Sequence, residues 1–371
     1  MADLLLGQAY YLRFDPKLFQ AQQPYAPLGT LYAASYLRER GHSVVLFDAM
    51  LAESVADWGA ALERHRPRIA AIYEDSFNYL SKMCLLRMRE AALAMIDQAV
   101  RAKVPILISG SDATDHPELY LRRGATAVIL GEGELTIADL ADRLLVGGPI
   151  EDVPGIAYLD DVCAVRRTSA RPFIKSLDDL PFPAWDLVDI DRYREIWYGR
   201  HGYYSMNIAT TRGCPYHCNW CAKPIYGQRY ATRSPKAVVE EIAWLKRHFA
   251  PDHLWIVDDV FGLKPVNKSD GEGFHLTDGR VTLNIMQWSI PIFEGMGIKR
   301  PGADHIGFKV ENIDTFKEHV RTTMGGNTFL NPMPLGGNKE AEVRKAFLAK
   351  AGGGKVQMAD PGGNWIVVDD E

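Results

Sequence analysis

The sequence predicts an α/β fold that opens with a doubly wound parallel sheet. Over residues 1–145, short apolar segments alternate with amphipathic segments whose apolar residues recur at helical spacing. Gly41 and Gly124 stand where two of the helical segments are expected to end. Strands that alternate with helices in this way are typical of a parallel sheet with helices on both faces. The predicted strands are ADLLLGQA, HSVVLFDA, PRIAAIYE, VPILISG and ATAVILGEGE.

The predicted helices lie between these strands. They are LGTLYAASYLRERG, SVADWGAALERH, a longer stretch from Leu80 to Lys103, and HPELYLRRG. Ligands of doubly wound sheets bind at the carboxyl ends of the strands. This rule places one set of candidate binding residues on a common rim: Gln8, Ser76, Ser109, Gly110, Ser111, Gly131, Glu132 and Gly133.

Length and composition set broad limits. A chain of 371 residues is expected to hold two or three domains at roughly 150 residues each. The net charge of −5 argues against nucleic-acid binding through a basic surface. No apolar run reaches the roughly 18 residues of a membrane span, and the first residues lack a basic region and a cleavage site. A cytoplasmic protein is therefore expected.

The rest of the chain falls into three segments. Residues 146–205 form a connector rich in proline and aspartate, whose Trp and Phe residues predict that it packs against its neighbours. Residues 206–265 begin with MNIATTRGCPYHCNWC, a strand that leads into a cysteine loop. A helix capped by Ser234 and a second strand, HLWIVDD, follow that loop. Residues 266–371 contain glycine-rich turns and short alternating strands.

Three of the five cysteines crowd into the stretch CPYHCNWC, as Cys214, Cys218 and Cys221. Three thiolates on one short loop can hold three irons of a four-iron cluster and leave the fourth iron open. A structural zinc site needs a fourth ligand, and His217 is badly placed to provide it. The spacing therefore favours a cluster over zinc or idle thiols.

The remaining cysteines, Cys84 and Cys163, stand alone in the sequence. Unpaired cysteines of this kind commonly behave as small hydrophobic residues. We therefore expect both to be buried.

The cysteine loop resembles the CxxxCxxC motif of the radical S-adenosylmethionine (SAM) superfamily, which follows the first strand of a partial (β/α) barrel. In that family the open iron binds the amino and carboxylate groups of SAM, and electron transfer cleaves SAM to a deoxyadenosyl radical. The resemblance implies that Trp220 lies near the adenine, with a core aromatic as the alternative. It also implies a reductant such as ferredoxin or flavodoxin and a small-molecule substrate that the sequence does not identify.

Residues on both sides of the cysteines resemble the cobalamin-dependent branch of that family. Arg212-Gly213 precedes the cysteines, and KPIYGQRY follows them. The first 145 residues resemble the cobalamin-binding domain of that branch through PLGTLYAASYLRERGH, SGSDAT and GEGE. The resemblance assigns the rim residues to cobalamin and, because a DxHxxG motif is absent, implies binding without a protein histidine on cobalt. The alternative is a flavodoxin-like sheet without a ligand.

Asp258 and Asp259 end the second predicted barrel strand. The superfamily places polar groups there that hold the amino group of SAM, at the strand ends where sites in such barrels gather. A carboxylate can bind that ammonium through a charge-assisted hydrogen bond. A pair of solvated turn residues is the alternative.

Residues 302–369 resemble the second module of a vicinal oxygen chelate protein, from the glyoxalase and dioxygenase superfamily built of βαβββ units. The resemblance lies in GADHIGFKVENIDTFKEHV and MADPGGNWIVV, and residues 273–288 resemble the end of a first module. His305 occupies a ligand position of the module, but Val367 stands where the family has a glutamate. Because a lone histidine does not hold a divalent cation, we expect no metal site there and interpret His305 as a half-buried strand residue.

Neither resemblance covers a complete domain. The radical SAM barrel normally has six strand-helix units, and this chain leaves the pattern after the second strand. The stretch VFGLKPV fits both families, which suggests a fusion of two unrelated genes at FGLKP. By resemblance, the function is that of a cobalamin-dependent radical SAM enzyme that catalyses methyl transfer, a radical rearrangement or a cyclisation. The alternatives are a chimera that binds cobalamin and a cluster without turnover, and a glyoxalase- or dioxygenase-like protein.

Overall fold

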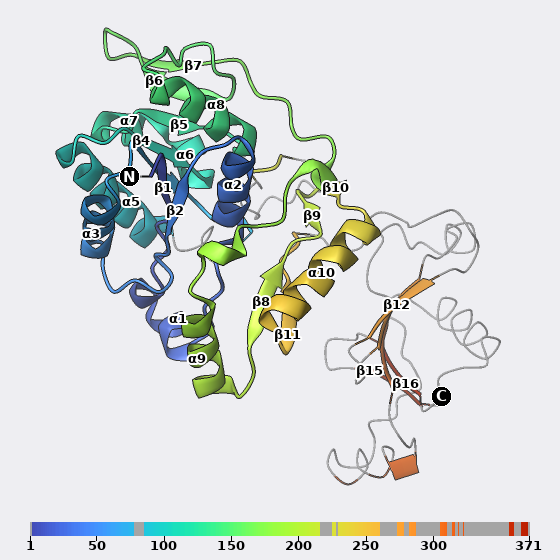
Figure 1. Ribbon diagram of the computed structural model, residues 1–371. Coiled ribbons are helices and arrows are strands. Elements are labelled where there is room, and N and C mark those ends of the chain that lie inside the picture. The colour runs from blue at the N-terminus through green and yellow to red at the C-terminus, as the bar shows by residue number, and fades with distance from the viewer. Residues whose placement is uncertain are drawn as a thin grey trace. The chain divides into compact units, whose positions relative to one another are not determined.

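The computed structural model describes most of the first 259 residues and separate segments beyond them. The chain divides into two compact units, Met1–Phe261 and Gly262–Glu371 (Figure 1). The described residues are 2–77, 85–215, 225–227, 229–259, 273–277, 282–286, 305–309, 314–315, 318, 322, 356–359 and 365–369.

A seven-stranded sheet forms the centre of the first unit, in the order β2-β1-β3-β4-β5-β6-β7. The strands from β2 to β5 are parallel, in the order typical of a flavodoxin-like doubly wound sheet. The predicted fold class and all five predicted strands of residues 1–145 are therefore confirmed. The parallel strands are β1 (Leu4–Gly7), β2 (Val44–Phe47), β3 (Ile69–Tyr73), β4 (Ile106–Ser109) and β5 (Ala127–Ile129).

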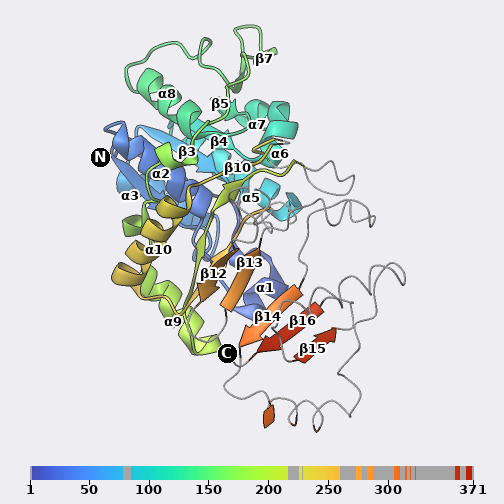
Figure 2. The same ribbon diagram turned by 90° about the vertical axis from the view of Figure 1, so that its right-hand side faces the viewer.

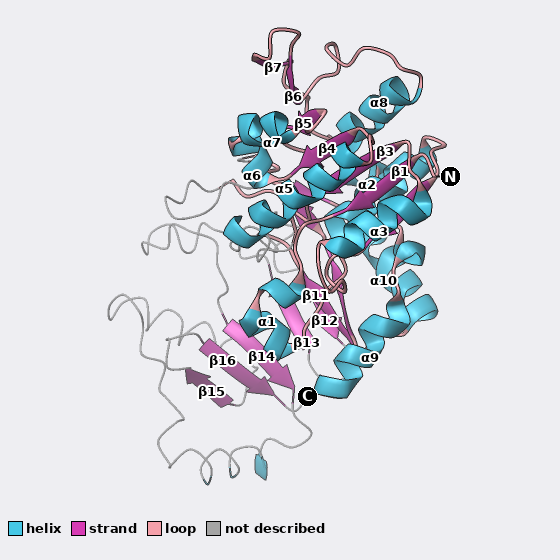
Figure 3. Ribbon diagram, turned by 90° about the vertical axis from the view of Figure 1, so that its left-hand side faces the viewer, coloured by secondary structure: helices cyan, strands magenta, loops and turns pink. Residues whose placement is uncertain are grey.

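Helices cover both faces of this sheet, and the central strands are apolar along their whole length for that reason. β1, β3 and β4 are buried at every residue, whereas the edge strand β2 is only half-buried. Figure 3 shows the helices around the strands. No helix in the described part of the chain has the length and apolar character needed to cross a membrane. The helices of this region are α1 (Pro16–Ala21), α2 (Leu28–Glu39), α3 (Ala56–His65), α5 (Leu85–Arg101), α6 (Ser111–Asp115), α7 (Pro117–Arg123) and α8 (Glu134–Leu145).

The connector packs firmly, as its aromatic residues predict. Trp185 and Trp197 are each 1% exposed, and the Trp197 indole donates a hydrogen bond to the carbonyl of Pro24 at 2.7 Å. The connector also contains structure that the sequence patterns did not indicate. β6 (Ile156–Leu159) and β7 (Val165–Arg167) extend the sheet antiparallel beyond β5 (Figure 3), and β7 is also labelled in Figure 2. α9 (Ile190–His201) then leads to the cysteine region.

The prediction that Cys163 is buried is wrong. Cys163 is exposed and adopts a φ of 57° in the tight turn between β6 and β7. Its backbone N–H donates to the carbonyl of Asp160 at 2.8 Å, which fixes the turn and leaves the side chain outside. Cys84 lies outside the described residues.

The cysteine region holds two parallel strands, β8 (Ser205–Ile208) and β11 (His253–Ile256), joined through α10 (Pro235–Phe249). Ser234 caps α10 as predicted, because its hydroxyl accepts from the Ala237 N–H at 3.1 Å. Two short strands flank the loop itself, and they pair antiparallel. They are β9 (Thr211–Arg212) and β10 (Ala231–Thr232).

The second unit contains a hairpin and a three-stranded sheet among its described residues. β12 (Gly273–Thr277) pairs antiparallel with β13 (Thr282–Met286). In the order β14-β16-β15, β16 (Trp365–Asp369) pairs parallel with β14 (His305–Lys309) and antiparallel with β15 (Val356–Ala359). The proposed fusion stretch FGLKP lies outside the described residues.

Candidate functional site

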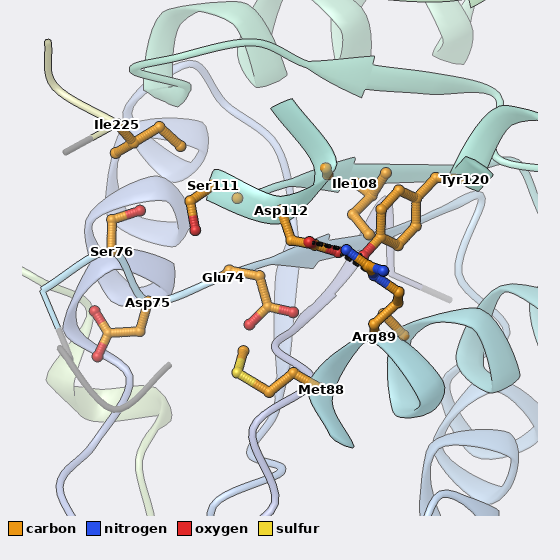
Figure 4. A pocket seen from close by; sticks show the side chains of 13 residues that line it. Glu74, Asp75, Ser76, Met88, Arg89, Ile108, Ser111, Asp112, Tyr120 and Ile225 are labelled. Atoms are coloured by element: carbon orange, nitrogen blue, oxygen red, sulfur yellow. Dashed lines mark hydrogen bonds and ion pairs between the residues drawn. The ribbon is translucent and has the colours of Figure 1, made fainter. Parts of the chain in front are cut away.

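A pocket opens at the carboxyl edge of the sheet, beside the ends of β3 and β4. Ser76, Gly110 and Ser111 line it, so the strand-end rule brings three of the predicted rim residues together. Ile225, four residues beyond Cys221, completes the wall. Figure 4 shows Arg89, Asp112 and Tyr120 at one side of the pocket, and Ser76, Ser111 and Ile225 at the other.

Gln8 and Ser109 are buried at the same edge, exposed by only 1% and 2%. The Gln8 side-chain oxygen accepts from the Tyr10 N–H at 2.6 Å. Its amide nitrogen has no hydrogen-bond partner within the described part of the chain. A buried donor without a partner is costly, so this nitrogen is a natural contact for a bound ligand.

Glu74 stands in the middle of the pocket wall, although the sequence patterns did not single it out. Its carboxyl group accepts from the Ala9 N–H at 3.1 Å. Burial raises the pKa of Glu74 to about 8, and that hydrogen bond opposes the shift only in part. Gly110 makes room for it, because a Cβ on Gly110 would lie 2.8 Å from Cγ of Glu74.

Replacing Glu74 by glutamine is expected to flatten the pH dependence of stability. As the pH rises from the unfolded value near 4.5 towards 8, the unfolded chain loses this proton while the folded chain keeps it. The free energy of unfolding of the wild type therefore falls across that window. Urea unfolding between about pH 5 and pH 8 measures the effect, and Glu74→Gln should lose less stability than the wild type. Parallel curves for the two proteins would contradict the raised pKa.

Arg89 and Asp112 form an ion pair at the pocket, with nitrogen-oxygen distances of 2.8 and 2.5 Å. The Tyr120 hydroxyl also donates to Asp112. Burial alone would raise the pKa of Asp112, but the hydrogen bonds from Arg89 and Tyr120 outweigh it and lower that pKa. The pocket thus presents a fixed ion pair, the Glu74 carboxyl group with its raised pKa, and two serine hydroxyls to a ligand.

The turn after β5 carries Gly131, Glu132 and Gly133, the remaining predicted rim residues. Glu132 faces the cysteine region: its carboxylate oxygens accept from Arg212 at 2.8 Å and from Arg229 at 3.3 Å. The Ile174 N–H donates to it at 2.7 Å. The described partners of Glu132 are therefore protein groups, and a role for it in cobalamin binding stays a prediction.

Arg212 is the centre of this contact. It also binds Glu134 at 2.8 Å, and its side chain is 3% exposed. Three aromatic rings surround the guanidinium, with centroids 5.3 Å away at Tyr32, 5.4 Å at Phe77 and 4.9 Å at Tyr226. We call these side chains the Arg212 cluster: Glu132, Glu134, Arg212, Arg229, Tyr32, Phe77 and Tyr226.

The cysteine loop begins directly after Arg212. Gly213 has a φ of 79°, and a Cβ there would overlap the carbonyl oxygen of Arg229, so only glycine fits where the two ends of the loop meet. Cys214 follows as a half-buried free thiol. Cys218, Trp220 and Cys221 lie outside the described residues.

The Asp258 side chain forms hydrogen bonds to the residues that lead into this loop. Its carboxylate accepts from the Thr210 N–H at 2.7 Å, from the Thr210 hydroxyl, and from the Thr211 N–H at 2.9 Å. Asp258 therefore holds the chain just ahead of Cys214, while Asp259 is exposed. The binding of SAM by either residue stays a prediction.

Replacing Asp258 by alanine is expected to lower the free energy of unfolding by roughly 1–3 kcal/mol, because two backbone donors lose their acceptor. Asp161→Ala, at an exposed aspartate in the turn between β6 and β7, is the matched control, and its exposed site predicts a change within about 0.5 kcal/mol. Urea unfolding of both variants without cofactors measures the difference. Equal stability of the two variants would show that the contacts of Asp258 contribute little.

His305 lies in β14 opposite Trp365, and Val367 lies in β16 opposite Gly307. His305 and Val367 therefore lie on two strands that pair with each other. Groups of three or more metal-binding side chains do not occur in the described part of the chain, which leaves out two of the three loop cysteines.

Comparison with known protein families identifies a domain within the first unit. The model of the family described as the B12-binding domain matches residues 18–141. Residues 18–141 are a B12-binding domain. This match lies within the predicted cobalamin-binding domain of residues 1–145, whose bounds stay a prediction.

Two curated proteins are similar to a larger part of this chain. An uncharacterized methyltransferase of Pyrococcus horikoshii is 29% identical over 80% of this chain and 58% of its own length. The anaerobic magnesium-protoporphyrin IX monomethyl ester cyclase of a Synechocystis species is 30% identical over 60% of this chain and 42% of its own length. The chain thus spans about half the length of these curated relatives.

A solved structure shares the fold. The cobalamin-dependent S-adenosylmethionine radical enzyme OxsB, with aqua-cobalamin bound, has a TM-score of 0.56 and 21% identity to this chain. The similarity covers 71% of this chain and 35% of that protein. It extends beyond the B12-binding domain, which takes up a third of the chain.

Proposed function

We propose that this chain acts in cobalamin-dependent radical SAM chemistry, as a methyltransferase or as an enzyme of radical rearrangement or cyclisation. The observation that carries the proposal is the pocket wall shared between two parts of the chain. Ser76, Gly110 and Ser111 come from the B12-binding domain, and Ile225 comes from the far end of the cysteine loop. Cofactors bound at these two places would therefore lie next to each other.

The residues of the pocket fit cobalamin. The Ser76 and Ser111 hydroxyls of the pocket suit the amide side chains of a corrin ring, which both donate and accept hydrogen bonds. Gln8 does not line the pocket, but its unsatisfied amide lies at the same edge of the sheet. Gly110 leaves the strand end open, since a side chain there would collide with Glu74.

The residues of the cysteine loop fit a four-iron cluster. Cys214 is a free, half-buried thiol at the point where Gly213 lets the chain turn. Cys218 and Cys221 would supply the second and third thiolates, which leaves one iron open for SAM. When bound, the cluster supplies the electron that cleaves SAM, and cobalamin supplies a carrier for the methyl group. Trp220 and Asp259 are the proposed contacts of SAM, with Asp258 holding the loop entry.

The test is anaerobic reconstitution with iron and sulfide, addition of hydroxocobalamin, and reduction in the presence of SAM. We expect bound cobalamin, a cluster, and the release of deoxyadenosine or S-adenosylhomocysteine, with ferredoxin or flavodoxin as reductant. Cobalamin and cluster without either product would overturn the proposal and favour the alternative of a binder without turnover. We keep such a binder as the second candidate; β8 and β11 form a two-stranded sheet in the part of the chain that the structure describes.

We also propose that the second unit contains a vicinal oxygen chelate module without a metal. The parallel pairing of β14 with β16, and the antiparallel pairing of β15 with β16, supports a βαβββ unit. Helical residues described between β14 and β15 support it as well. Isothermal titration of the metal-free protein with Mn²⁺ or Fe²⁺ tests the absence of a metal site, and tight binding that depends on His305 would contradict it.

A further inference from the structure

The Arg212 cluster joins two parts of the first unit through buried charges. Glu132 and Glu134 come from the turn after β5 and the start of α8, and Arg212 and Arg229 come from either side of the cysteine loop. The side chains of Glu132, Glu134 and Arg212 are 4%, 1% and 3% exposed. Ion pairs this deeply buried cannot exchange partners with water, so their geometry is fixed once the protein has folded.

The cluster reaches both the cysteine loop and the pocket. Arg212 lies two residues before Cys214 in the chain. The pocket residue Ser76 is followed directly by Phe77, and the pocket residue Ile225 is followed directly by Tyr226.

Both of these aromatic rings belong to the cage around Arg212. The ring centroids of Phe77 and Tyr226 are 5.4 Å apart, and each ring packs on the guanidinium. A ligand that fills the pocket would therefore contact Ser76 and Ile225, the residues next in the chain to two walls of the cage.

We propose that Glu132 and Glu134 are positioning residues that hold Arg212, and with it the start of the cysteine loop, so that occupation of the pocket stabilises the loop around its cluster. This inference rests on the proposed function and adds a link between the two cofactor sites. By thermodynamic reciprocity, the cluster would strengthen cobalamin binding by the same factor.

The experiment measures how fast the reconstituted full-length protein loses iron to a chelator, with and without hydroxocobalamin. In the wild type, cobalamin should slow iron loss roughly fivefold or more, the lower end of typical coupling between two sites. The decisive variant combines Glu132→Gln, Glu134→Gln and Arg212→Met. Removing the three most deeply buried charges together leaves only Arg229, which is 27% exposed, without its carboxylate partner, whereas a single substitution would strand a fully buried charge. In this variant cobalamin should bind but leave the rate of iron loss unchanged.

The matched control removes an exposed ion pair, Arg38→Met with Asp186→Asn, whose partners join α2 to the connector at 2.8 Å. This control should keep the protective effect of cobalamin. Phe77→Leu removes one ring of the cage and no charge, so it should reduce the protective effect of cobalamin in part. This variant provides the test if the triple variant does not fold. The electron paramagnetic resonance signal of the reduced cluster should shift on adding cobalamin in the wild type and not in the triple variant.

The outcomes separate the two proposals. A wild type that forms no cluster or binds no cobalamin overturns the proposed function and this inference with it. A wild type that binds both, with iron loss slowed equally in the triple variant, overturns the inference alone.

Discussion

Cys214→Ala is expected to abolish the iron-sulfur cluster. With Cys218 and Cys221 alone, only two thiolates remain on the loop, and a site-differentiated four-iron cluster needs three. Iron and sulfide content after anaerobic reconstitution, together with the charge-transfer absorption of the cluster, measures the loss. SAM cleavage should disappear with it, whereas cobalamin binding to the B12-binding domain should persist.

Cys163→Ala is the matched control for this experiment. Cys163 is also a free thiol, and it is exposed in the turn between β6 and β7, away from the loop in sequence. Its removal should leave the iron content at the wild-type level. If Cys214→Ala kept the iron content of the wild type, the result would show that this motif does not bind the cluster.

Arg233→Met is expected to cost roughly 3–5 kcal/mol of unfolding free energy, because it leaves the buried carboxylate of Glu241 without its partner. The side chains of Arg233 and Glu241 are 7% and 0% exposed, and they form an ion pair between the residue before the Ser234 cap and the body of α10. Arg233 also donates to the carbonyl of Ala209 at 3.0 Å, which ties α10 to the end of β8. Urea unfolding without cofactors measures the loss.

The double variant Arg233→Met with Glu241→Leu tests the reason for this cost. Apolar replacement of both partners removes the unpaired charge, so most of the lost stability should return. Arg38→Met removes an exposed ion pair and should cost about 0–1 kcal/mol. A double variant as unstable as Arg233→Met would show that the loss comes from packing and not from the stranded carboxylate.

The sheet could be predicted well because the burial of each central strand is visible in the apolar residues of that strand. Strands covered on both faces, such as LLLG in β1 and IAAIY in β3, are apolar throughout, and this signal needs no knowledge of distant residues. β6 and β7 escaped prediction because they are short and partly exposed, with charged residues in β7. Strands of that kind are defined by their pairing to β5, which local patterns do not contain.

The sequence predicted only those site residues whose location follows from their place along one strand. The strand-end rule found Ser76, Gly110 and Ser111, since the place of a residue along a parallel strand follows from the strand alone. The partner of Glu132 could not be found in this way, because Arg212 lies 80 residues further along the chain. Spacing rules describe neighbours on one element, whereas buried ion pairs join elements that only the folded chain brings together.

The contacts of Asp258 have a consequence for how the protein is made. Asp258 follows the Thr210 and Thr211 amides that it holds by 48 and 47 residues. During translation the cysteines therefore leave the ribosome well before the residue that fixes the entry of their loop. The hydrogen bonds that hold Thr210 and Thr211 form only after Asp258 has been synthesised, so we expect the entry of the loop to be fixed late in the synthesis of this chain.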